Sequence, residues 1–93
     1  MSTKSERRDA RAVVAEYHEA QLRALASHLG HALDRYRAGE LDAFDIDHAA
    51  FQFHRAAKEL WKFCSLGRAE ITAATIIREP PDDWWERSAP RER

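Results

Sequence analysis

Apolar side chains recur at alternating intervals of three and four residues from about Ser5 to Arg37. That spacing places them on one face of an α-helix, and charged residues fill the other faces. The stripe consists of Val14, Leu22, Leu25, Leu29, Ala32, Leu33 and Tyr36. The pattern predicts one helix of roughly 50 Å, followed by Gly39 as a left-handed C-cap.

A second apolar stripe runs from about Ile46 to Ser65 with the spacing of a heptad seam. Its members are Ile46, Ala50, Phe53, Ala57, Leu60 and Cys64, and the stripe is widened on one flank by Phe51, His54 and Trp61. The connecting segment GELDAFDIDH offers Asp42, Asp45 and Asp47 as N-caps. Their charge also suits the positive end of the helix dipole, so we predict a second helix here.

The segment RAEITAATIIRE predicts a shorter third helix, which the Pro80–Pro81 pair stops. Its inward face consists of Ala69, Ala73, Ile76 and Ile77. After it, DDWWER has the composition of a short turn capped by Asp82. These features predict a single helical domain, residues 1–81, followed by a Trp-containing turn and Arg-rich tail, residues 82–93.

The short connection makes the first two helices antiparallel neighbours. In the predicted register Gly30 makes room for Phe53, and His18 meets Cys64. The first helix is the longer one, so Val13 and Tyr17 near its start have no partner in the hairpin. The third helix can cover part of this surface, and a second copy of the chain the rest. We therefore predict an all-α fold, a long antiparallel helical hairpin plus a shorter third helix, completed as a bundle by homodimerisation.

Composition narrows the functional classes. A length of 93 residues allows one domain, and a net charge of -1 gives no electrostatic reason to expect nucleic acid. No stretch approaches the ~20 apolar residues of a membrane span, and the first residues lack the apolar part of a secretory signal. The single cysteine excludes an intrachain disulfide and fits a reducing compartment. We expect a cytoplasmic protein without a membrane or nucleic-acid partner.

Histidine and cysteine side chains in DIDHAAFQFHRAAKELWKFC raise the question of a metal site. Helical residues advance by about 100° and ~1.5 Å each, so His48, His54 and Cys64 cannot reach one ion from a single helix. Across the hairpin, His18 and Cys64 would make a reactive pair if the thiol were accessible. The closed seam favours a hydrogen-bonded histidine beside an inert thiol, and we expect neither a metal nor another cofactor.

Two acidic pairs provide an enzymatic alternative. Glu16 and Glu19 form an E-x-x-E, and Asp42 with Asp45 forms a D-x-x-D. Their order resembles the all-α nucleoside triphosphate pyrophosphohydrolases, in which acidic pairs on adjacent helices hold magnesium over the triphosphate. Here the second pair falls in the turn, and Glu16 lies towards the other end of the hairpin. A solvated helix face with N-caps is the favoured interpretation.

Three tryptophans are candidate interaction residues, because Trp is enriched at binding hot spots. We expect Trp84 to fold back and close the bundle, and the adjacent Trp85 to point away towards a second subunit. The candidate partner contacts are therefore Trp85, Val13 and Tyr17.

Three segments, GELDAFDID, HRAAKELWKFC and DWWERSAPRER, resemble a set of small bacterial proteins recorded only as hypothetical. The resemblance covers Gly39 to Cys64 and the C-terminal segment, and the first helix only loosely. It implies a bacterial, cytoplasmic, helical protein and carries over no catalytic residue. The leading functional prediction is a non-enzymatic interaction or assembly module, a homodimer with room for a further protein partner.

Overall fold

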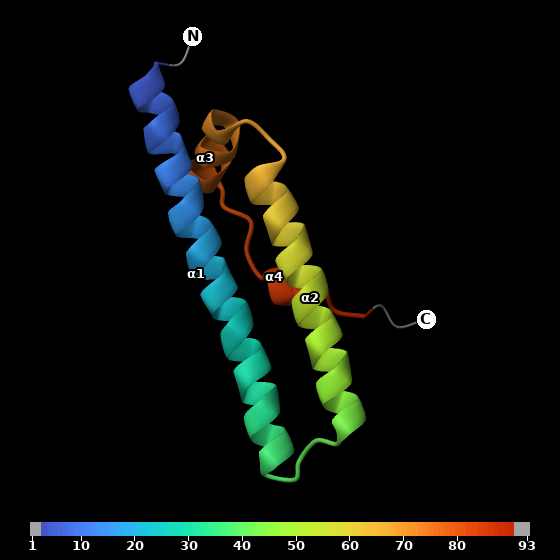
Figure 1. The fold of residues 1–93 in the computed structure, drawn as a ribbon. Helices are drawn as coiled ribbons and strands as arrows, with labels where there is room; N and C mark the ends of the chain where they lie inside the picture. The colour runs from blue at the N-terminus through green and yellow to red at the C-terminus, as the bar shows by residue number, and fades with distance from the viewer. Residues whose placement is uncertain (1–2, 91–93) are drawn as a thin grey trace.

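The computed structural model describes residues 3–90, which contain helices and no strand. The helices are α1 (Lys4–Arg37), α2 (Ala43–Ser65), α3 (Ala69–Arg78) and α4 (Trp84–Arg87). Helices α1 and α2 form an antiparallel hairpin, and α3 packs beside the first half of α1 (Figure 1). The predicted all-α class, the hairpin and the third helix are confirmed.

Side-chain caps fix where the two long helices begin. The Thr3 hydroxyl accepts a hydrogen bond from the Glu6 amide, at 3.1 Å, and starts α1. Asp42 and Asp45 form a capping box in which each carboxylate accepts from the other residue's backbone amide, both at 2.9 Å. This box satisfies two amide groups that a helix start leaves without partners. It starts α2 at Ala43, earlier than the expected Ile46.

The interface between α1 and α2 forms the main core. Leu25 and Leu60 are almost fully buried, together with Ala56. Ala50, which the heptad pattern placed in the seam, is exposed, whereas Ala49 is partly buried. Successive residues are about 100° apart around a helix. Helix α2 is therefore rotated about its axis by less than 100° from the predicted orientation.

Helix α3 covers the start of α1, where a second cluster contains Ala10, Val14 and Ala73. Val13 packs against this cluster, and Tyr17 belongs to the main core. The surface near the start of α1 that a second copy was expected to share is therefore largely covered within the chain.

Three further local predictions are wrong. Ile77, expected on the inward face of the third helix, keeps 71% of its surface exposed, whereas its neighbour Ile76 packs against the core. A Cβ atom at Gly30 would meet nothing within 4 Å, so Gly30 does not make room for Phe53. Gly30 comes five residues after the buried Leu25, which turns it about 140° away around the helix. The cap of the last turn is Asp83 instead of Asp82, since the Asp83 carboxylate accepts from the Glu86 amide at 3.3 Å.

Candidate functional site

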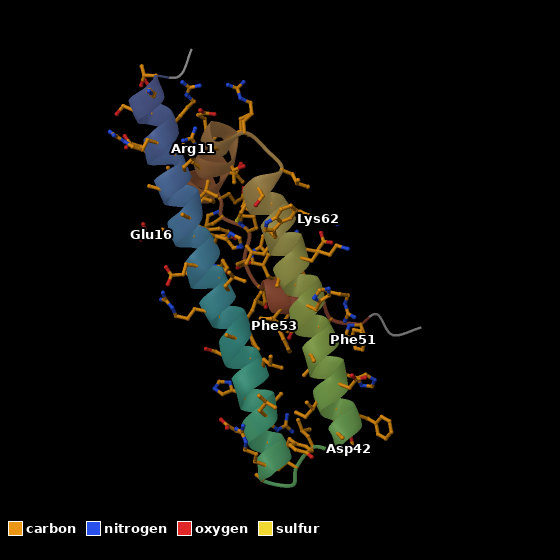
Figure 2. The ribbon with its side chains drawn as sticks, viewed as in Figure 1. Arg11, Glu16, Asp42, Phe51, Phe53 and Lys62 are labelled. Atoms are coloured by element: carbon orange, nitrogen blue, oxygen red, sulfur yellow. The ribbon has the colours of Figure 1, made fainter. Side chains whose placement is uncertain are left out.

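The acidic pairs lie far apart. Glu16 and Glu19 are exposed on α1, where Glu19 pairs with Arg23 at 2.9 Å. Asp42 and Asp45 form the capping box at the other end of the hairpin. The stretch of α1 between Glu16 and its last turn is about 30 Å long, and Figure 2 shows Glu16 and Asp42 correspondingly separated. Within residues 3–90 no three His, Cys, Asp or Glu side chains are grouped so that they could hold a metal ion.

Cys64 is a half-buried free thiol that packs against both core clusters. Burial raises the pKa of the Cys64 thiol above its usual value of 9.0. The thiol is therefore protonated at neutral pH, and the thiolate needed for nucleophilic or redox chemistry is disfavoured. In the part of the chain that is described, no hydrogen bond joins it to His18.

Tyr17 and Trp84 form a polar contact inside the core. The Tyr17 hydroxyl donates to the Pro81 carbonyl at 2.5 Å and accepts from the Trp84 indole N–H at 2.7 Å. The Tyr17 ring also meets Phe63 edge-on, with ring centres 5.8 Å apart. Burial raises the pKa of the Tyr17 hydroxyl above its usual 10.0. Trp84 thus closes the bundle, as expected, and Tyr17 has its hydroxyl engaged within the chain.

Trp85 also makes its contacts within the chain. Its indole stacks on the His28 ring, with centres 4.8 Å apart and planes 4° from parallel. Its backbone carbonyl accepts a hydrogen bond from the Gln52 side chain at 2.8 Å. Much of the Trp85 surface is therefore in contact with α1 and α2, and less of that surface is accessible to a partner.

The remaining candidate contact, Val13, lines a shallow depression of about 320 Å³ between α1 and α3. The other lining residues are Glu16, Tyr17, Ala20 and Ile76. Apart from Glu16 and the Tyr17 hydroxyl, which is already bonded, this lining is apolar. The depression therefore lacks the converging polar groups that orient a small ligand.

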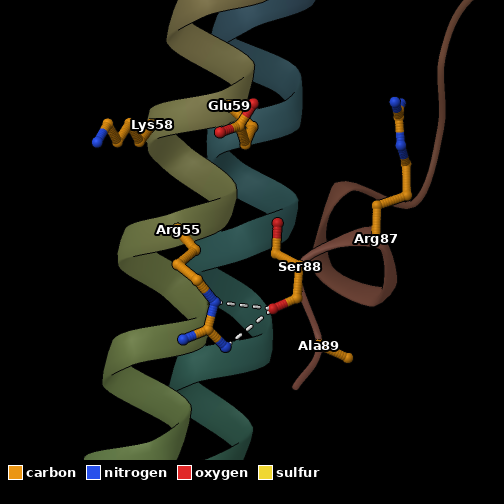
Figure 3. Close-up of a pocket in the computed structure, with 6 residues that line it drawn as sticks. All are labelled: Arg55, Lys58, Glu59, Arg87, Ser88 and Ala89. Atoms are coloured by element: carbon orange, nitrogen blue, oxygen red, sulfur yellow. Dashed lines mark hydrogen bonds between the residues drawn. The ribbon is translucent and has the colours of Figure 1, made fainter. Parts of the chain in front are cut away.

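A second open depression, of about 440 Å³, lies between α2 and the segment after α4 (Figure 3). It is lined by Arg55, Lys58, Glu59, Arg87, Ser88 and Ala89. The Arg55 guanidinium donates twice to the Ser88 carbonyl, at 3.1 and 2.9 Å. Figure 3 shows Lys58 and Arg87 pointing away from each other on opposite sides. The three cations do not converge, and Arg55 holds the segment after α4 against α2.

The exposed side of α2 carries a second stripe of side chains. Its members, which we call the outer face of α2, are Phe44, Asp47, Phe51, His54, Lys58 and Trp61. All six are exposed, and the aromatic residues Phe44, Phe51 and Trp61 keep 78%, 57% and 52% of their accessible surface. In Figure 2 Phe53 lies on the side of α2 that faces α1, and Phe51 lies on the other side.

Sequence reasoning assigned Phe51, His54 and Trp61 to a flank of the buried stripe and overlooked this surface. The signal was present, because residues 44, 47, 51, 54, 58 and 61 follow each other at intervals of three and four. That is itself a helical stripe, out of phase with the stripe that faces α1.

Comparisons of the chain with protein-family models, curated proteins and solved structures found no match. Within residues 3–90 no helix combines the length and the apolar character that crossing a membrane requires.

Proposed function

We propose that this protein is a non-enzymatic interaction and assembly module whose working surface is the outer face of α2. One observation carries the proposal: three large aromatic side chains lie exposed on one side of a helix whose opposite side is already packed in the core. Large exposed aromatic side chains aligned on one face of a helix are typical of surfaces that bind another molecule.

The composition of this face favours a protein partner. Phe and Trp are enriched in protein–protein interfaces, where their rings supply most of the contact area. The face also carries one acidic residue, Asp47, and one basic residue, Lys58. A nucleic acid would require an excess of basic residues, and the whole chain has a net charge of -1. The module acts in the cytoplasm, consistent with a lone reduced thiol at Cys64.

Site-specific photo-crosslinking tests this proposal. The substitution Phe51→p-benzoylphenylalanine places a reactive ketone on the outer face, and Ile77→p-benzoylphenylalanine places the same group on α3. Ile77 is a matched control because its apolar side chain is also exposed. Irradiation in cells and of the purified protein should give discrete protein adducts from position 51 and none from position 77. Equal adduct patterns from both positions, or none from position 51, would contradict the proposal.

A further inference from the structure

We infer that the molecule docked on the outer face of α2 is a second copy of this chain, with the two α2 helices antiparallel about a two-fold axis. This inference rests on the proposed function and names the partner of the same surface. It follows from the spacing of the six residues of the outer face and from the way in which their side chains complement one another.

The spacing is that of a helix-pairing seam. Between Phe44 and Trp61 the six residues are separated by three, four, three, four and three positions. Side chains at these intervals form the line along which two helices pack at a small crossing angle. The seam is about 26 Å long, which corresponds to a small interface and a concentration-dependent dimer.

In one antiparallel register every aromatic residue of the face meets another ring. Phe44 of one copy then lies opposite Trp61 of the other, and the symmetry repeats this pair at the far end of the seam. Near the two-fold axis, Phe51 lies opposite His54, again twice. Paired aromatic rings attract one another in edge-to-face or offset-stacked geometry, in addition to the apolar area that they bury.

The same register pairs the charges. Asp47 of one copy lies opposite Lys58 of the other, and neither residue has an ion-pair partner elsewhere in residues 3–90. The two cannot pair within one chain, because eleven helical residues separate them by about 16 Å. A surface that carries both signs at positions exchanged by a two-fold axis is self-complementary.

Other arrangements of the two helices lose these pairs. Parallel helices would place Asp47 opposite Asp47 and Lys58 opposite Lys58, and such like-charge contacts are unfavourable. Moving the antiparallel helices by one heptad places Lys58 opposite His54 in one direction and Asp47 opposite Phe51 in the other. The charges therefore select one orientation and one register.

Charge exchange between the two copies tests the inference. We expect the parent chain to shift from monomer to dimer in sedimentation equilibrium between micromolar and millimolar concentration. Asp47→Lys and Lys58→Asp should each raise the dimer dissociation constant about tenfold or more, because every charged pair becomes repulsive. An equimolar mixture of the two variants should associate about as tightly as the parent, since both pairs are again opposite in sign.

Glu16→Lys, an identical change of charge at an exposed position of α1, is the control and should leave the dissociation constant unchanged. Circular dichroism of each variant confirms that the helices form. A parent chain that stays monomeric, or single variants that dimerise normally, would overturn the inference. So would single variants that weaken the dimer without recovery in the mixture. Adducts from position 51 to a different protein, with a monomeric chain, would overturn the inference and leave the proposed function standing.

Discussion

At the scale of single residues, the Tyr17 hydroxyl holds the C-terminal segment on the hairpin. It is the only hydrogen-bond partner that the described residues give to the buried Trp84 indole, and it also binds the Pro81 carbonyl. Removing the partner of a buried donor costs more free energy than removing the partner of an exposed one, because an exposed donor can bond to water instead. The Tyr17 hydroxyl therefore stabilises the fold by giving the Trp84 N–H and the Pro81 carbonyl a hydrogen-bond partner.

Tyr17→Phe should lower the free energy of unfolding by about 1–3 kcal/mol, because the Trp84 N–H and the Pro81 carbonyl lose their partner in the core. Urea denaturation followed by circular dichroism measures this change. Tyr36→Phe is the control, because it removes the same group from an exposed tyrosine. This substitution should change the free energy of unfolding by less than about 0.5 kcal/mol. Equal effects of the two substitutions would show that the internal bonds contribute nothing.

At the scale of an element, the two glycines of the α1 region have opposite roles. Gly30 lies inside α1 with open space around it, and Gly39 follows the helix with a φ of +81°. A helical backbone accepts a Cβ atom without strain, whereas a left-handed residue with a Cβ atom is strained. Gly30 thus weakens the helix without a packing reason, and Gly39 is required to turn the chain towards α2.

Gly30→Ala should raise the free energy of unfolding by about 0.5–1 kcal/mol, because alanine has the higher helix propensity and a Cβ atom meets no neighbour. Gly39→Ala should lower it by about 1 kcal/mol, since the left-handed conformation is then strained. Thermal unfolding of both variants beside the parent measures the two changes. A loss of stability in Gly30→Ala would mean that this position has a close neighbour after all.

At the scale of the whole molecule, the helices of residues 3–90 share a small core that the segment after Pro81 completes. The described residues measure 55 × 28 × 18 Å, an elongated shape with little interior. Trp84 keeps only 5% of its surface exposed and packs with Leu25 and Leu60. A chain of this size has few large buried side chains, so each contributes a large share of the stability.

Trp84→Ala should therefore lower the free energy of unfolding by about 3–5 kcal/mol, enough to unfold much of the population of a small domain. Trp85→Ala should lower the free energy of unfolding by less than half of that amount, because Trp85 stacks on His28 at the edge of the core. Near-ultraviolet circular dichroism and a thermal melt compare the two neighbours. If Trp84→Ala kept the parent's melting temperature, the segment after Pro81 would contribute nothing to the stability of the bundle.

The order and type of the helices could be predicted because their signals are local. Apolar periodicity, the acidic capping residues before α2 and the proline pair after α3 act within a few positions of the chain. The charged face of α1 and the separation of the acidic pairs were also readable from spacing alone. These features need no knowledge of what packs against the helix.

Only the tertiary structure decided which way each helix faces. One step along a helix turns the side chain by about 100°, so the same stripe allowed either Ala50 or Ala49 to be buried. It also allowed Gly30 to lie against Phe53 or away from it. The burial of Tyr17 and Trp84 depends on a contact between segments more than sixty residues apart, which no local pattern encodes. The outer face of α2 emerged in the same way, because exposure is a property of what the rest of the molecule leaves uncovered.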